Sequence, residues 1–202
     1  MRKLSLCMFA FSLGFASLTH AQQPMVTKVT FKGNTAHAAA ASGDNGCFSA
    51  FFGVTASDEV SKGDNGTTTT KTVEIGYGGR DLCEHLSFGG RQDKPLTFNI
   101  ANQTMTFDFD FLVNYANTET NERFTRRVTG TVTITPNGDV ERSRRNEISQ
   151  NQEVRTVTRS KGTTRDATVT VNVSIDGVPQ ALPIVSGEVG SVSKGTIETT
   201  RY

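Results

Sequence analysis

The sequence predicts an all-β protein, built as a single antiparallel β-sandwich or a partly closed barrel of roughly ten strands with one disulfide. Three observations lead to this fold class. Apolar and polar residues alternate along many short segments, turn-forming residues separate those segments, and no segment repeats its apolar residues with the helical period. Threonine and valine, which favour strands, recur throughout the chain.

Residues 1–21 have the three-part layout of a secretory signal peptide. Arg2 and Lys3 precede an apolar run at 4–15, and Thr19 and Ala21 supply small residues before a cleavage point. The run is too short to span a bilayer as a helix, and no transmembrane segment is predicted elsewhere. We therefore expect residues 22–202 to form a single β domain that is secreted or periplasmic.

The alternation is clearest at residues 104–113. There Met105, Phe107, Phe109, Phe111 and Val113 share one face of a predicted strand, while Asp108 and Asp110 lie on the other with threonines. Residues 124–135 and 167–175 repeat the scheme. These are expected to be half-buried antiparallel strands. Weaker strands are predicted at 26–32, 35–41, 47–56, 68–77, 82–88, 140–148, 154–159 and 189–198.

Turn-forming residues lie between these predicted strands. Pro136-Asn137-Gly138 predicts a hairpin with a type I turn and a glycine bulge, in which Ile134 faces Val140. Asp176-Gly177 predicts another turn. The string GDNG occurs at 43–46 and 63–66 and is interpreted as two further turns. Its oxygens offer calcium binding as an alternative, although the full spacing of a calcium loop is absent.

Two cysteines, Cys47 and Cys83, lie beyond the predicted signal peptide, and export to an oxidising compartment predicts that they form a disulfide. An alternative arises from RDLCEHLSFGG at 80–90. In a strand, Asp81, Cys83 and His85 would share one face, as a thiolate nucleophile with its base or as metal ligands. A disulfide excludes both roles for the cysteine because each requires a free sulfur.

Charge is nearly balanced overall but uneven along the chain. Removing residues 1–21 takes two of the 21 basic residues and none of the 20 acidic ones, so net charge indicates no class of partner. Segment 123–165, however, carries ten basic and four acidic residues. A guanidinium group binds phosphate, sulfate or carboxylate through two parallel hydrogen bonds. The arginines predicted to bind anions are Arg126, Arg127, Arg142, Arg144, Arg145, Arg155 and Arg159; the alternative is that they pair with neighbouring carboxylates.

Two other groups of residues suggest chemistry. Asp108 and Asp110 would lie ~6–7 Å apart on one strand face, a separation compatible with a glycosidase pair. The alternative is an ion pair with Arg127 on the next strand. His37 and His85, with Asp81, would suit an open metal site, but no HxH or HExxH spacing supports it. No metal or cofactor is predicted, and no nucleotide-binding or serine-hydrolase motif is present.

These patterns favour a secreted, non-enzymatic β protein that binds an anionic polymer or envelope component through an arginine-rich sheet face. The expected partners are an anionic polysaccharide, lipopolysaccharide or an extracellular protein. The alternative is a secreted hydrolase that uses Asp108 and Asp110, or a metal site at His37 and His85. Few aromatic residues accompany the arginines, so stacking on nucleic-acid bases is not indicated. The sequence does not indicate an oligomeric state.

Overall fold

The computed structural model describes residues 24–42, 46–100 and 103–202. The predicted signal peptide, residues 1–21, lies outside the described residues. The described chain forms one antiparallel sheet, which confirms the predicted all-β class. Its ten strands are β1 (Met25–Ala41), β2 (Phe48–Gly63), β3 (Gly66–Asp81), β4 (Leu86–Pro95), β5 (Met105–Asn117), β6 (Arg123–Pro136), β7 (Glu141–Gln150), β8 (Val154–Ile175), β9 (Val178–Gln180) and β10 (Ile184–Arg201).

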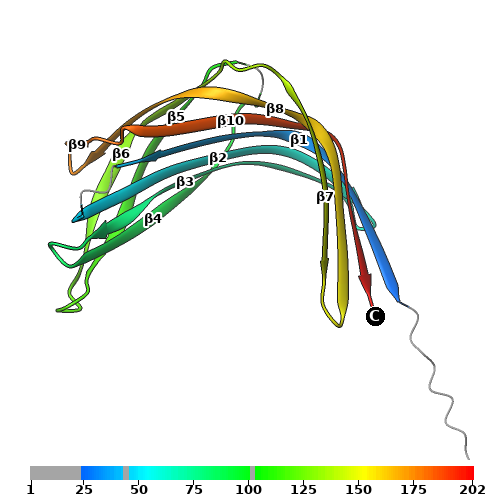
Figure 1. The fold of residues 1–202 in the computed structure, drawn as a ribbon, viewed down its shortest axis with the longest axis horizontal. Coiled ribbons are helices and arrows are strands. Elements are labelled where there is room, and N and C mark those ends of the chain that lie inside the picture. Colours follow the sequence, from blue (N-terminus) through cyan, green and yellow to red (C-terminus); the bar gives the residue numbers. More distant parts are fainter. Residues whose placement is uncertain (1–23, 43–45, 101–102) are drawn as a thin grey trace, which may run out of the picture.

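The strand pairings return to their starting point. The order runs β10–β1–β2–β3–β4–β5–β6–β8, and β10 also pairs with β8. Strands β7 and β9 lie outside this cycle, each against β8. Figure 1 shows the resulting sheet as a strongly curved layer. The sheet is therefore continuous, and one of its faces can enclose a core.

Strand β8 belongs both to the cycle of strands and to a part of the sheet that projects from it. Its second half, residues 167–175, pairs with β6, and its first half lies between β7 and β10. In Figure 1, β7 and the neighbouring ends of β8, β10 and β1 bend away from the rest of the sheet. We call this projecting part the limb; it consists of residues 25–32, 141–150, 154–163 and 194–201.

The core lies on one face of the cycle and follows the predicted alternation. In β5, the odd-numbered residues from Met105 to Tyr115 are buried and the intervening Asp108 and Asp110 are exposed. The rings of Phe88 and Tyr115 stack with centroids 4.8 Å apart. The buried set is completed mainly by alanine, valine, isoleucine and phenylalanine from β1, β2, β3, β6, β8 and β10.

Strands β4 and β5 pair over only part of their length. Their register joins residues 86–89 to 114–117. Beyond it, Gln92 Nε2 donates to the carbonyl of Asp110 at 2.9 Å, and Lys94 Nζ donates to the carbonyl of Asp108 at 2.9 Å. Side chains of β4 thus bind β5 carbonyl groups on the edge where the β4–β5 ladder has ended, while β6 pairs with the other edge.

The predicted hairpin at Pro136-Asn137-Gly138 is wrong. Strands β6 and β7 do not pair with each other; they lie end to end along the same edge of β8. The amides of Asn137 and Gly138 both donate to the carbonyl of Asp166, at 3.0 and 3.2 Å. Because β8 is long enough to pair with both segments, the chain interrupts its ladder at 137–140 without reversing. The local turn preference is overridden by this longer partner.

Other predicted turns are confirmed. Asp176 and Gly177, with φ of 48° and 83°, link β8 to β9, and both positive values suit a two-residue turn of type I′. The second GDNG string, 63–66, connects β2 to β3. Most of the first lies outside the described residues. The strands predicted separately at 26–32 and 35–41 are one continuous strand, β1.

Strand β10 contains a β-bulge next to the limb. Val192 pairs with Gly162 and Lys194 pairs with Lys161, so two steps along β10 correspond to one step along β8. The extra residue reverses which side chains of β10 point to a given face. As a result Lys194 and Thr196 share the face that Val189 occupies on the other side of the bulge.

Two substitutions in β5 test the assignment of its faces. Phe109 is 3% exposed and Leu112 is 60% exposed. Phe109→Ala should lower the free energy of unfolding by about 3–5 kcal/mol because it leaves a cavity in the core. Leu112→Ala should change it by about 0.5 kcal/mol or less. Urea denaturation of both variants measures the difference; equal effects would contradict the proposed burial.

Candidate functional site

Cys47 and Cys83 form the predicted disulfide, with their Cα atoms 5.2 Å apart. The bond links the start of β2 to the turn between β3 and β4. It leaves no free thiol at Cys83 to act as a nucleophile or a zinc ligand. The alternative reading of RDLCEHLSFGG as a thiolate centre is therefore excluded.

The strand predicted at 82–88 is wrong in its first half. Residues 82–85 form the β3–β4 turn, and β4 begins at Leu86. Asp81 Oδ1 accepts hydrogen bonds from the amides of Cys83 and Glu84, both at 3.1 Å. His85 adopts a positive φ of 53°. A carboxylate that binds amides two and three residues ahead favours a turn over an extended strand.

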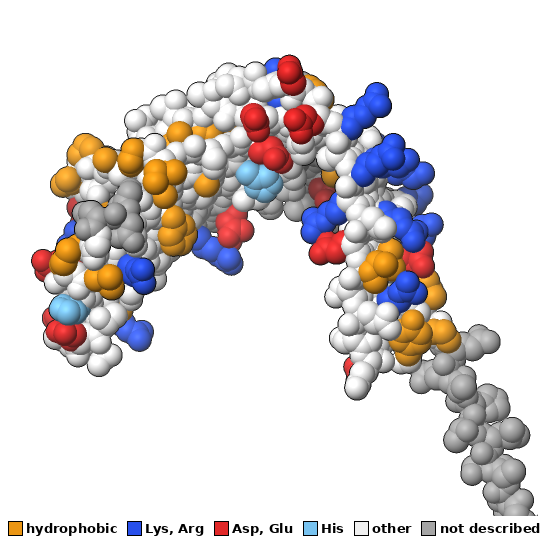
Figure 2. Space-filling view, viewed as in Figure 1, with side chains coloured by type: hydrophobic (Ala, Val, Ile, Leu, Met, Phe, Trp, Pro, Cys, Tyr) orange, Lys and Arg blue, Asp and Glu red, His pale blue; other side chains and the backbone are white. Residues whose placement is uncertain are grey.

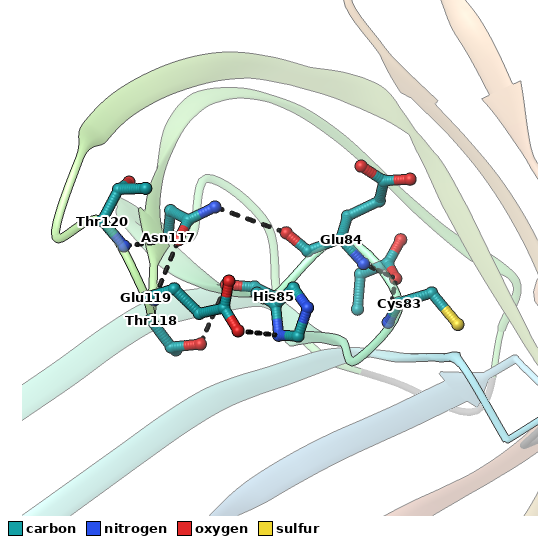
Figure 3. A network of polar contacts seen from close by, with 8 residues as sticks. Cys83, Glu84, His85, Asn117, Thr118, Glu119 and Thr120 are labelled. Atoms are coloured by element: carbon teal, nitrogen blue, oxygen red, sulfur yellow. Dashed lines mark hydrogen bonds and ion pairs between the residues drawn. The ribbon is translucent and has the colours of Figure 1, made fainter.

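This turn is bound to its neighbour, the β5–β6 turn at 118–122 (Figure 3). The amide and Oγ1 of Thr118 donate to the carbonyl of His85 at 2.7 and 3.0 Å. His85 Nδ1 lies 3.3 Å from Glu119 Oε1. The histidine thus lies in a junction between two turns, where its polar contacts serve the local structure.

The structure does not bring His37 and His85 together. His37 lies on the outer face of β1, with Nδ1 3.3 Å from Thr55 Oγ1. His37 pairs with Thr55 on β2, and Thr55 pairs with Glu74 on β3. Glu74 and Asp81 lie ~23 Å apart along β3, so His37 is far from the turn that contains His85. Among the described residues, no three histidine, cysteine, aspartate or glutamate side chains are arranged to hold a metal ion.

Asp110 forms an ion pair with Arg127. Arg127 Nε donates to Asp110 Oδ1 at 2.8 Å, and Nη2 donates to Oδ2. These hydrogen bonds, with the guanidinium charge, hold the pKa of the Asp110 carboxyl below its usual value. The pairing that the sequence offered as the alternative to catalysis is therefore present, and Arg127 is already bound to a carboxylate.

The seven predicted arginines fall into two separate groups. Arg126 and Arg127 lie near the start of β6, where Arg126 stacks over the rings of Tyr115 and Phe124 at 5.3 and 5.5 Å. The other five lie on β7 and the first half of β8. Val128 pairs with Ile175 and Arg142 pairs with Thr163, so ~40 Å of strand separates the groups. They cannot bind one small anion together.

On the limb, one face carries the exposed cations. Within β8, Arg155, Arg159 and Lys161 share a face with the buried Val169 and Val173, because side chains alternate along the strand. We call this surface the cationic face. From cross-strand pairing and alternation, it comprises Lys28, Lys32, Arg142, Arg144, Arg155, Arg159, Lys161 and Lys194. Figure 2 shows Lys and Arg side chains gathered over the limb.

Few carboxylates accompany these cations. Within the described part of the limb, Glu198 is the one carboxylate on the cationic face. Arg145 points to the opposite face, where its Nε donates to Glu147 at 2.9 Å. No ion pair joins a side chain of the cationic face to a carboxylate of the described chain. The alternative that the arginines pair with neighbouring carboxylates thus holds for Arg127 and Arg145. It does not hold for Arg142, Arg144, Arg155 or Arg159 in the described chain.

The centre of the cationic face is a row of three like charges. Arg144 lies directly opposite Lys161, and Lys161 lies directly opposite Lys194. Directly opposite residues on neighbouring strands have Cβ atoms about 4.5–5.5 Å apart, and like charges in such positions destabilise a sheet. The row lines a hollow of about 520 Å³, together with Lys28 and Arg159. A bound anion would reduce the repulsion among these groups.

Sequence reasoning missed Lys28, Lys32 and Lys194. Each is a lysine far from segment 123–165, so no local charge run indicated it. Strand pairing and alternation bring all three to the cationic face, and the bulge in β10 turns Lys194 toward Lys161. Alternation within β1 could have predicted the face on which Lys28 lies, but the sequence does not show which residues of other strands lie beside it.

No protein-family model, curated protein sequence or solved structure matches the chain. Within residues 24–42, 46–100 and 103–202, no helix has the length and apolar character needed to cross a membrane.

Replacing both cysteines tests the contribution of the disulfide. The bond closes a loop with a sequence separation of 36 residues. Cys47→Ser with Cys83→Ser should lower the free energy of unfolding by about 3–4 kcal/mol, because the unfolded chain gains conformational freedom. Guanidinium denaturation should show this loss, and the wild-type protein measured after reduction is the control. Unchanged stability would contradict the role given to the disulfide.

The Asp110–Arg127 pair predicts a pH dependence. Because the folded protein lowers the pKa of Asp110, the pair stabilises the fold above the usual aspartate pKa of ~3.9, and this contribution is lost as the pH falls through the lowered value. Arg127→Gln should raise the pKa of Asp110 toward its usual value in an NMR titration of the carboxyl carbon. Arg123→Gln is the control and should leave that pKa unchanged. An unshifted Asp110 in Arg127→Gln would disprove the assignment.

Proposed function

We propose that this chain is a non-enzymatic binding protein that takes up an anionic polymer or envelope component on the cationic face of the limb. The observation that carries the proposal is the row Arg144–Lys161–Lys194, with three like charges on adjacent strands and no paired carboxylate in the described chain. An unliganded protein bears the cost of this repulsion, and a polyanion relieves it.

The shape of the surface supports a polymer over a small enclosed ligand. The hollow is open, and two further cations lie beyond it: Arg142, two residues from Arg144 on β7, and Arg155, four residues from Arg159 on β8. Cations two residues apart on a strand are ~6–7 Å apart, and those directly opposite each other on neighbouring strands are ~5 Å apart. A chain with many negative groups would contact several of these side chains at once.

Recognition on this surface would depend on charge. The lining of the hollow contains lysine, arginine, asparagine, serine, threonine and glycine, and no aromatic ring. Without a flat ring, neither sugars nor bases have a surface on which to stack. Phosphate, sulfate and carboxylate groups fit the arginine and lysine donors that are present.

Export is part of this proposal. The disulfide favours an extracytoplasmic location, where thiols are oxidised. The predicted signal peptide at 1–21 would direct the chain there. The partners proposed there are anionic polysaccharide and lipopolysaccharide, which carry the phosphate, sulfate or carboxylate groups that arginine and lysine bind. No specific observation favours the hydrolase alternative: Asp110 is bound by Arg127 on an exposed strand face.

Retention on heparin resin tests the proposal. Wild-type protein should bind at low salt and elute as salt rises. The triple variant Arg144→Gln, Lys161→Gln and Lys194→Gln should elute at lower salt, and the slope of log affinity against log salt should fall by about three, one for each lost cation.

A matched control removes the same charge elsewhere. Arg80→Gln, Arg91→Gln and Arg123→Gln alter three exposed arginines outside the limb. This control should elute with the wild-type protein. Passage of the wild-type protein through the resin without retention at low salt would overturn the proposed function.

A further inference from the structure

The end of the limb combines the cationic face with exposed apolar side chains. Val26 is 55% exposed and Ile148 is 57% exposed. Val26 lies opposite Thr200, which lies opposite Arg155; Ile148 lies opposite Val157. Alternation therefore places Val26 and Ile148 on the same face as Arg155 and the rest of the cationic face.

Two further apolar residues lie at this end. Met25, the first residue of β1, is 55% exposed and by alternation lies on the face opposite Val26; Tyr202, which follows β10, is 63% exposed. The amide of Tyr202 donates to the carbonyl of Glu153 at 3.0 Å, which fixes it beside the β7–β8 turn. Figure 2 shows hydrophobic side chains toward the end of the limb, below most of its Lys and Arg side chains. Val26 and Ile148 are two separate apolar side chains, on β1 and β7 with β10 and β8 between them, and both lie on the same face as the cations.

A purely polar polyanion accounts for the cations but gives Val26 and Ile148 nothing to contact. A lipid surface with anionic headgroups accounts for both. Lysine and arginine side chains bind the headgroup phosphates, while apolar side chains enter the boundary between headgroups and acyl chains. The limb is suited to this contact because it projects from the rest of the sheet (Figure 1).

We propose that the limb docks on a membrane surface that contains phosphate-bearing anionic lipids. Arg144, Arg159 and Lys161 bind headgroup phosphates, and Val26 and Ile148 insert at the interface. The inference rests on the proposed function, because it uses the same cationic face, and it names the anionic component as a lipid. Glu198, the carboxylate on this face, lies opposite Lys28. The eight cations of the face outnumber it, so the surface remains attractive to anions.

Vesicle co-sedimentation of the full chain tests this proposal. Wild-type protein should bind vesicles of phosphatidylcholine mixed with phosphatidylglycerol and should not bind vesicles of phosphatidylcholine alone. The double variant Val26→Ser and Ile148→Ser should bind the mixed vesicles about tenfold more weakly, because it loses apolar surface buried at the interface. Its retention on heparin should be unchanged, since no charge is altered.

A control double variant, Leu112→Ser and Val178→Ser, removes apolar groups that are 60% and 62% exposed and lie outside the limb. It should bind the mixed vesicles as the wild-type protein does. Circular dichroism establishes that each variant is folded before binding is measured.

The outcomes separate the two proposals. A wild-type protein that binds heparin but not the mixed vesicles disproves lipid docking and leaves polyanion binding standing. Full vesicle binding by the Val26→Ser and Ile148→Ser variant also disproves lipid docking as stated. Failure to bind heparin overturns the proposed function itself.

Discussion

The register of β8 is the constraint on which the rest of the structure depends. This strand is hydrogen-bonded along both edges over its first half, and its second half closes the cycle of strands through β6. Because side chains alternate strictly along it, the residues that share a face with Val169 and Val173 are fixed all the way back to Arg155. One strand therefore determines both which residues pack in the core and which cations project from the limb.

Much of the fold follows from local sequence. The alternation in β5 predicts its buried and exposed residues correctly, and two cysteines beyond a predicted export signal predict the disulfide. The predictions that were wrong concern segments whose conformation depends on contacts outside the local alternation pattern. Asn137-Gly138 is suited to a hairpin, yet the edge of β8 offers both β6 and β7 a longer ladder. Residues 82–85 alternate as a strand would, but the Asp81 carboxylate binds two amides and forms a turn.

The candidate site was predictable only in part, for a related reason. A local run of arginines identified β7 and the first half of β8 as cationic, but it did not separate Arg126 and Arg127 from the limb. Sequence distance is misleading here because β6 and β7 lie end to end. Lys28 and Lys194 come from the two ends of the described chain and reach the same surface only through strand pairing. Which charged side chains lie next to one another in a sheet depends on strand register more than on their separation in the sequence.

The bulge at Val192 and Lys194 separates the facing of β10 in the limb from its facing in the core. A single additional residue reverses the facing of everything that follows it in β10, while the packed residues before it are unaffected. The gain or loss of one residue at that position would exchange a face with Lys194 and Glu198 for one with Gly195 and Ile197. A change of length alone would thus alter which β10 side chains this end of the molecule presents, while Val189 keeps its place in the core.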